Sequence, residues 1–112
     1  MERIPCVYLL ASGFHGTLYI GVTSNLVGRL YQHREGVTDG FSKRYGVKRL
    51  VWFELHGTME TAIKREKSIK RWQRQWKIEL IERENPTWRD MAEDFGFESV
   101  IVNKVDSGSR PE

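Results

Sequence analysis

Side chains suited to phosphodiester chemistry recur in the first third of the chain. Tyr8 is followed eleven residues later by Tyr19, and Arg29 and His33 stand four residues apart. Residues at positions i and i+4 share one side of a helix. Phenols, a guanidinium and an imidazole can together hold phosphate oxygens and move a proton, so their series indicates a site for phosphodiester chemistry.

Two alternating apolar segments are expected to form strands that position the tyrosines: residues 5–11 and 17–22. A four-residue loop, Ser12 to His15, would join them as an antiparallel hairpin and set Tyr8 directly opposite Tyr19. Opposed residues have Cβ atoms roughly 5 Å apart, so we expect both hydroxyls to reach one ligand atom or water. Core aromatics on a half-buried sheet are the alternative interpretation.

A helix that carries Arg29 and His33 should follow the hairpin. Ser24 or Asn25 can cap its first turn, and Gly36 ends it. Its expected buried stripe has four members: Leu26, Val27, Leu30 and Tyr31. Arg29 flanks this stripe, which suits a clamp on phosphate oxygens. His33 is equally consistent with a hydrogen-bonded bystander and with a proton carrier.

Further elements are predicted downstream of a surface loop at 36–45. Leu50–Leu55 is β-prone and should be a third strand, and Thr58 caps a long helix broken near Gln73. Asn85-Pro86 ends that helix, and Thr87 caps a short last helix reaching Phe95. The order predicts an α+β fold with a small three-stranded antiparallel sheet flanked by helices, a ββαβα core plus C-terminal helices.

Length and composition favour one domain. The chain has 112 residues and 39% hydrophobic content, enough for one modest core, which we place at 1–103 before a disordered polar tail at 104–112. Cys6 is the only cysteine, so an intramolecular disulfide is excluded. The longest apolar run, Cys6 to Ala11, is far below the roughly 20 residues that span a bilayer. Without a signal peptide, a cytoplasmic location is expected and no membrane partner.

Basic residues are concentrated in the middle of the chain. Residues 29–50 hold six Lys and Arg against two Asp and Glu, and residues 64–77 hold seven against one. Such a distribution suggests a surface for a polyanion, although solvated helix faces with ordinary ion pairs would also explain it. The cations expected to contact phosphates are Lys43, Arg44, Lys48, Arg49, Lys70 and Arg74.

Glu66 and two tryptophans stand out on the long helix. Glu66 falls on the same stripe as Ala62 and Ile69, so its carboxylate needs compensation by a divalent cation or by pairing with Arg29 or a lysine. Trp72 and Trp76 could stack exposed bases, but packing in the core is the favoured interpretation.

The ordered series resembles the GIY-YIG nuclease family. Tyr19-Ile20-Gly21 matches its second motif, and Cys6-Val7-Tyr8 keeps the tyrosine of its first motif but replaces the glycine. The resemblance continues through Arg29, His33, Glu66 and Asn85 and covers residues 4 to 90. The small stand-alone bacterial members, which end in a Trp-rich helix and an Asn-Pro-x-Trp segment like residues 85–88, look most similar.

The resemblance implies a metal-dependent DNA endonuclease, structure-specific in repair or processing. Glu66 would hold one Mg²⁺ or Mn²⁺, Tyr8 would deprotonate the attacking water beside Tyr19, and Asn85 would support the site, although Asn before Pro is also an ordinary helix stop. Branched or single-stranded DNA is the expected partner, with a protein partner or targeting subunit as an addition. The alternatives are a nucleic-acid-binding module without useful turnover and an interaction protein that docks through its Trp-rich helix.

Overall fold

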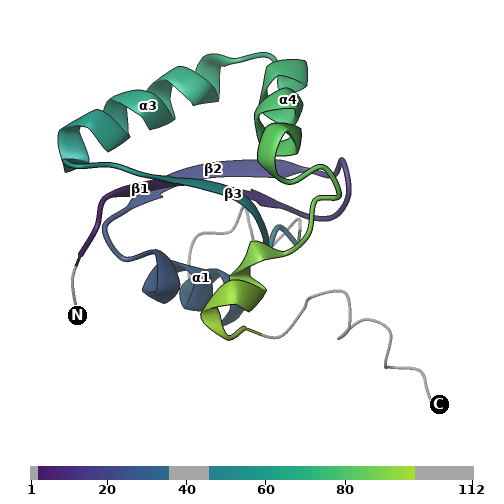
Figure 1. Cartoon of the computed structure of the whole chain (residues 1–112), viewed down its shortest axis with the longest axis horizontal. Helices are drawn as coiled ribbons and strands as arrows, with labels where there is room; N and C mark the ends of the chain where they lie inside the picture. Colours follow the sequence, from purple (N-terminus) through teal and green to yellow (C-terminus); the bar gives the residue numbers. More distant parts are fainter. Residues whose placement is uncertain (1–2, 36–45, 98–112) are drawn as a thin grey trace.

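Three layers make up the part of the chain that the computed structural model describes, residues 3–35 and 46–97 (Figure 1). The middle layer is a sheet of three strands: β1 (Cys6–Ala11), β2 (Leu18–Thr23) and β3 (Arg49–Leu55). Helices α3 (Met59–Arg71) and α4 (Arg74–Glu84) cover one face, and α1 (Leu26–Glu35) with the 3₁₀ helix η1 (Met91–Phe95) covers the other. The α+β class and the antiparallel sheet are confirmed.

Strand β1 lies in the centre of the sheet, between β2 and β3, and is antiparallel to both. Since successive residues of a strand point to opposite faces, its six buried residues serve two cores. One core, beneath α3 and α4, receives Val7, Leu9 and Ala11. The other, toward α1 and η1, receives Cys6, Tyr8 and Leu10. Burial raises the pKa of the Cys6 thiol to about 11, so that side chain behaves as a small apolar group.

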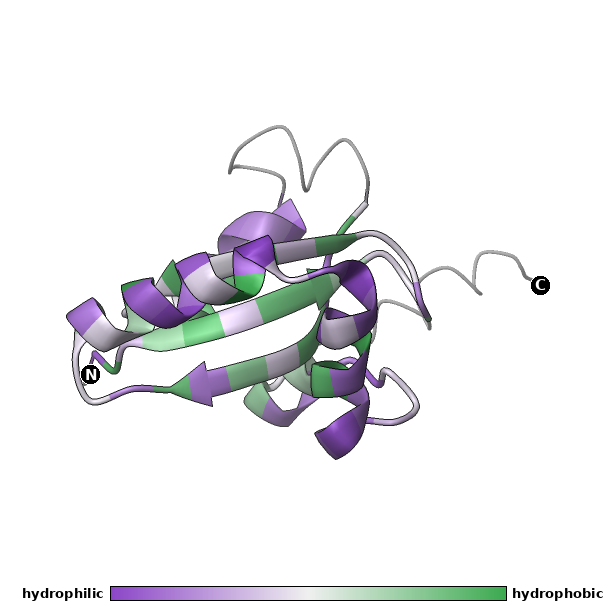
Figure 2. Cartoon of the chain, turned by 90° about the horizontal axis from the view of Figure 1, so that it is seen from above, coloured by the Kyte–Doolittle hydropathy of each residue, from purple (hydrophilic) through white to green (hydrophobic). Residues whose placement is uncertain are grey.

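The view onto α3 and α4 shows how hydropathy follows these layers (Figure 2). Both helices are coloured mainly hydrophilic, while the strands beneath them are mainly hydrophobic. Ala62 and Ile69 of α3 and Leu80 and Ile81 of α4 are the buried members that pack on the sheet. No helix among the described residues is long and apolar enough to cross a membrane.

The hairpin register differs from the expected one by two residues. Tyr8 pairs with Gly21 and Tyr19 with Leu10, so the predicted direct opposition of the two tyrosines is wrong. The loop runs from Ser12 to Thr17, closed by the Ser12 amide on the Thr17 carbonyl at 3.0 Å and by the Thr17 amide on the Ser12 hydroxyl at 2.9 Å. A shift of two residues preserves the strand's faces, and both phenols therefore remain on the α1 side.

Helix α1 is capped by Asn25, whose Oδ1 accepts the Gly28 amide at 3.1 Å, as one of the two predicted caps. Its buried face is different from the expected stripe. Leu30 and His33 are buried, whereas Val27 and Tyr31 are 40% and 59% exposed. Compared with the expected orientation, the helix turns His33 toward the core, where its imidazole forms a hydrogen bond with the Tyr8 hydroxyl.

The downstream elements follow the sequence-based prediction up to Asn85. Thr58 caps α3, and the break at Trp72 and Gln73 separates α3 from α4. Asn85 ends α4, but the predicted cap at Thr87 is wrong, because Asp90 accepts the Ala92 amide at 3.1 Å and caps the shorter η1. The predicted end at Gly36, the 36–45 loop and the 104–112 tail lie outside the described residues.

A nearly buried ion pair fixes α1 against the sheet. Arg34 donates to both carboxylate oxygens of Asp90, at 2.9 and 2.7 Å, and its Nε donates to the Lys48 carbonyl at 3.0 Å. Asp90 also accepts the Leu50 amide at 3.1 Å. Because one guanidinium binds both the Asp90 carboxylate and the Lys48 carbonyl, the end of α1 is held in place, and His33, the residue before Arg34, has a defined position under the sheet.

Candidate active site

Tyr8 and His33 form a buried pair between β1 and α1. Each is 1% exposed, and the Tyr8 hydroxyl lies 3.1 Å from Nε2 of His33. The pair can share its proton in either sense, because the phenol donates to a neutral Nε2 and an Nε2–H donates to the phenol oxygen. A proton arriving at one ring therefore has a path to the other.

Tyr19 connects this pair to the surface. Its ring centroid lies 6.3 Å from that of Tyr8 and 5.2 Å from that of His33. Tyr19 is half-buried, and it lines a pocket on the edge strand β2. The three rings thus lead from the interior of the α1 layer to the open edge of the sheet.

Glu66 faces the same pocket from α3. The pocket measures about 580 Å³ and is lined by Leu18–Val22 of β2, by Glu66 and Lys70 of α3, and by Lys77 of α4. The Glu66 side chain is 12% exposed, and the Lys70 ammonium lies 3.8 Å from its Oε2. One carboxylate and two ammonium groups therefore share this pocket with Tyr19.

Arg29 lines a second pocket, of about 320 Å³, at the start of α1. Val22 belongs to both pockets, so they are neighbours along β2. Among the described residues, no hydrogen bond or ion pair engages the Arg29 guanidinium. The N–H donors of this guanidinium remain available to an anion that extends from the Glu66 pocket past Val22 into the second pocket.

The single carboxylate of the pocket, Glu66, suits a metal ion that a substrate also binds. Within residues 3–35 and 46–97, His, Cys, Asp and Glu form no group of three that could hold an ion by themselves. Mg²⁺ commonly binds one or two carboxylates and completes its shell with waters and phosphate oxygens. Glu66, a single carboxylate facing a pocket with room for a phosphate, fits that mode.

Of the predicted phosphate-contacting cations that the structure describes, one lines the Glu66 pocket and three do not. Lys70 lines the Glu66 pocket, and its side chain is 68% exposed. Arg49 instead is 9% exposed and donates to the Trp88 carbonyl at 3.0 Å, which places it in the protein interior. Lys43 and Arg44 lie outside the described residues.

Arg74 and Lys48 are also found away from both pockets. The Arg74 guanidinium donates to the His15 carbonyl and, at 2.8 Å, to the Gly16 carbonyl, so it fastens α4 to the β1–β2 loop. Lys48 is half-buried, and its carbonyl accepts from Arg34. Both residues hold the scaffold together in this structure.

Asn85 acts as a structural clamp. Its Nδ2 donates to the carbonyls of Val51 and Arg89 at 3.1 and 2.9 Å, and its Oδ1 accepts the Arg89 amide at 3.0 Å. It is 6% exposed and lines neither pocket. These contacts support the helix-stop interpretation of the Asn-Pro sequence.

Sequence reasoning missed Lys77 as a residue of the Glu66 pocket. Lys77 lies on α4, after the break at Trp72 and Gln73, and is half-buried there. The spacing of seven from Lys70 was visible in the sequence, but a shared pocket depends on the angle between α3 and α4, which no local pattern gives.

Comparisons with known proteins identify the family of this chain. The model of the GIY-YIG catalytic domain matches residues 4–79. A UPF0213 protein of Staphylococcus saprophyticus is 35% identical over 66 residues, which are 59% of this chain and 80% of the relative. A UPF0213 protein of Staphylococcus aureus shows the same identity and coverage. None of the solved structures gave a significant match. The chain belongs to the GIY-YIG family, whose domain has a nuclease-type fold.

Proposed function

We propose that this protein is a divalent-metal-dependent endonuclease that hydrolyses phosphodiester bonds in DNA. The observation that carries the proposal is the meeting of Tyr19 and Glu66 in one pocket, with Arg29 in the adjoining one. A scissile phosphate at Val22, between the two pockets, would lie within reach of a carboxylate, a phenol and a guanidinium. Family membership supports a nuclease-type reaction, and we propose DNA as its substrate and a divalent metal ion as its cofactor.

Substrate binding falls to the cations that line the pockets. Arg29 would hold two non-bridging phosphate oxygens with its fork of donors. Lys70 and Lys77 would take the neighbouring phosphates of the strand. Because these contacts reach the backbone and no module for reading bases is recognisable, binding should depend on salt and on DNA structure more than on sequence.

Proton transfer falls to the three rings. Tyr8 was expected to contact the attacking water, but its 1% exposure and its bond to His33 favour Tyr19 for that contact. Tyr19 would orient the water and accept its proton while its own hydroxyl proton passes to the Tyr8–His33 pair, where the His33 imidazole would hold it as an imidazolium. Glu66 would hold Mg²⁺ or Mn²⁺, and the bound ion would supply Lewis acidity toward the phosphate.

The experiment is a cleavage assay of the purified protein on branched, nicked and plain duplex DNA, with Mg²⁺, with Mn²⁺ and with a chelator. We expect products with Mg²⁺ or Mn²⁺ and none with the chelator. Binding of the same DNA without cleavage under every condition would replace the endonuclease by a binding module that keeps the fold.

A further inference from the structure

Trp76 lies in the first turn of α4, next to the break at Trp72 and Gln73. We call the junction of α3 and α4 around these residues the α3–α4 elbow. Trp76 is 50% exposed, so the expectation that both tryptophans pack in the core is wrong for this residue. Trp72 does pack against the core beneath α3 and α4. A half-exposed tryptophan keeps a large apolar surface in water, and an exposed apolar surface bordered by polar or charged side chains marks a binding site.

The Trp72 ring, which is packed on the core, contacts the Trp76 ring. The two rings meet edge to face, with centroids 6.1 Å apart and planes at 79°. The Arg65 guanidinium lies 5.4 Å from the Trp72 ring centroid, in cation–π contact.

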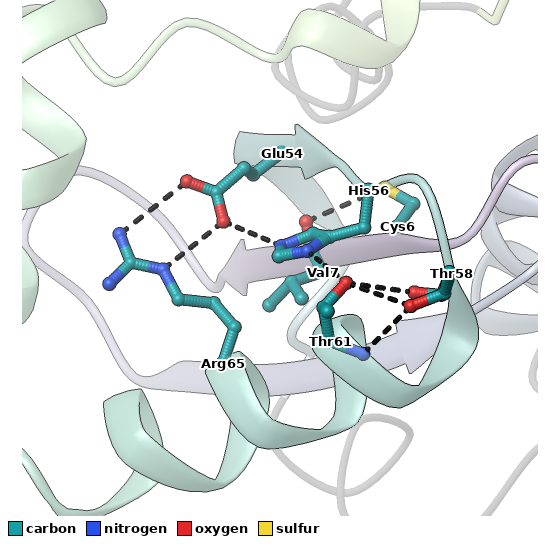
Figure 3. Close-up of polar contacts among 7 residues, drawn as sticks. All are labelled: Cys6, Val7, Glu54, His56, Thr58, Thr61 and Arg65. Atoms are coloured by element: carbon teal, nitrogen blue, oxygen red, sulfur yellow. Dashed lines mark hydrogen bonds and ion pairs between the residues drawn. The ribbon is translucent and has the colours of Figure 1, made fainter.

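Arg65 is itself held in place. Its Nε donates to Glu54 at 3.1 Å, and the same Glu54 oxygen lies 2.8 Å from Nε2 of His56 (Figure 3). The His56 ring continues to Thr61 at the start of α3, with Nδ1 at 3.0 Å from its hydroxyl. This network sets the position of the Trp72 ring, and so of the surface against which Trp76 stands.

The surroundings of Trp76 are strongly basic. Both tryptophans line two hollows, of about 420 and 320 Å³. The larger also contains Lys64, Lys67, Ser68 and Arg71, and the smaller contains Glu79 and Arg83. Four cations thus face one carboxylate, and none of the four makes an ion pair with any residue within the described ranges.

These cations continue around α3 toward the Glu66 pocket. Lys67 and Arg71 line the elbow hollow, while Glu66 and Lys70, the residues immediately before each of them, line the pocket on β2. Since consecutive helical residues are 100° apart, the basic surface wraps around the helix from one site to the other. A polyanion leaving the β2 pocket would meet positive charge over this whole path.

We propose that the α3–α4 elbow binds single-stranded DNA, with a base stacked on Trp76 and adjacent phosphates on Lys64, Lys67 and Arg71. Unpaired bases and a charged backbone match an exposed indole surrounded by free cations. In a duplex the base faces are covered by their neighbours, so duplex DNA would use the cations alone. The choice of DNA as the ligand rests on the proposed function, whereas the stacking site rests on the elbow itself.

The test compares the binding of a short fluorescent oligodeoxythymidine with that of an abasic strand of equal length, in chelator so that nothing is cleaved. Trp76→Ala should weaken oligodeoxythymidine binding roughly 5- to 150-fold, the effect of one lost stack, and leave abasic binding unchanged. Trp76→Phe should keep part of the preference for bases. Tyr31→Ala is the matched control, because Tyr31 is 59% exposed on α1 in the opposite layer and should change neither affinity.

Other outcomes would overturn the site. Equal losses for both strands would show that the indole does not stack on a base, and unchanged affinity in Trp76→Ala would remove it from binding. Self-association lost in Trp76→Ala, with no strand preference, would assign the elbow to a second copy of the chain. A protein that never cleaves DNA but shows the Trp76-dependent preference would refute the endonuclease and retain the elbow site.

Discussion

The Tyr8 ring occupies the space above Gly21, its partner across the β1–β2 ladder. A Cβ built on residue 21 would lie 2.5 Å from both Cζ and Oη of Tyr8, closer than such atoms approach in proteins. Gly21 itself lines the Glu66 pocket. The third residue of Tyr19-Ile20-Gly21 is therefore glycine because a buried phenol lies over the backbone beside the pocket.

We expect Gly21→Ala to displace the Tyr8 ring and strain its contact with His33. Overpacking of this kind costs about 1–3 kcal/mol of folding stability. Gly13→Ala is the control, since a Cβ there meets nothing within 4 Å. Thermal melting should show a lower Tm for Gly21→Ala alone, and cleavage should fall with it. Equal melting of the two variants would mean that the Tyr8 ring moves aside at no cost.

The elements were predictable where local chemistry decides them. Thr58 and Asn25 are caps because their side chains can accept the free amides of a first turn, and Asn85-Pro86 cannot continue a helix. The faces of β1 followed from its period of two. These features depend on neighbours in sequence, which the sequence itself displays.

The remaining features depend on partners distant in sequence. The hairpin register depends on the Ser12 side chain, which closes a longer loop than expected. The buried face of α1 depends on the hydrogen bond between His33 and Tyr8. Arg49 resembled a surface cation until its contact with the Trp88 carbonyl was visible. The pattern of Tyr19, Arg29 and Glu66 pointed to residues of the two β2 pockets, while Trp76 was assigned to the core because spacing shows a helical face without showing what covers it.

Glu66→Gln should abolish metal-dependent cleavage while DNA binding and melting temperature stay close to wild type, because the amide keeps the shape but is a poor ligand for a divalent ion. Glu60→Gln serves as the control, being an exposed carboxylate on the same helix outside both pockets. Cleavage rates over a Mg²⁺ titration, with DNA affinity measured in chelator, separate the two effects. Wild-type rates in a folded Glu66→Gln protein would exclude Glu66 as the metal ligand.

Arg29→Lys should reduce cleavage severely although the charge is kept, since a single ammonium cannot make bidentate contact with phosphate oxygens. The control is Arg89→Lys, because Arg89 pairs with Asp94 on the exposed surface and lines neither pocket. Single-turnover cleavage of saturated DNA reports the chemical step without the contribution of affinity. Activity near wild type would reduce Arg29 to a general surface cation.

Glu82 should make stability depend on acid pH. The hydrogen bond from His15, then that from the Trp88 indole, holds the pKa of this carboxyl below its usual 4.5. A folded-state pKa below the unfolded one gives stability that is present above 4.5 and is lost as pH falls through the folded value. The NMR signal of the Trp88 indole N–H should shift with this titration, and Glu82→Gln should flatten the acid side of the Tm profile. An indole signal that titrates at 4.5 or above would contradict the assignment.

The phenols of Tyr8 and Tyr19 should act on one proton. Tyr19→Phe keeps the ring and should preserve the fold, while single-turnover cleavage falls by about 10²–10⁴, the usual value of a positioned acid–base group. Tyr8→Phe removes the hydrogen bond between the phenol and Nε2 of the buried His33, so it should also lower the Tm, by the equivalent of about 0.5–1.5 kcal/mol.

A double-mutant cycle of these tyrosines tests the shared path. If Tyr19 orients the water and the Tyr8–His33 pair receives its proton, removing one hydroxyl disables the route that the other serves. The double variant should therefore lose less activity than the product of the two single losses. The Tm of each variant must be measured alongside, because the cycle is interpretable only if all four proteins are folded at the assay temperature. Fully multiplicative losses would show that the phenols act independently, and a fully active Tyr19→Phe protein would return the contact with the water to Tyr8.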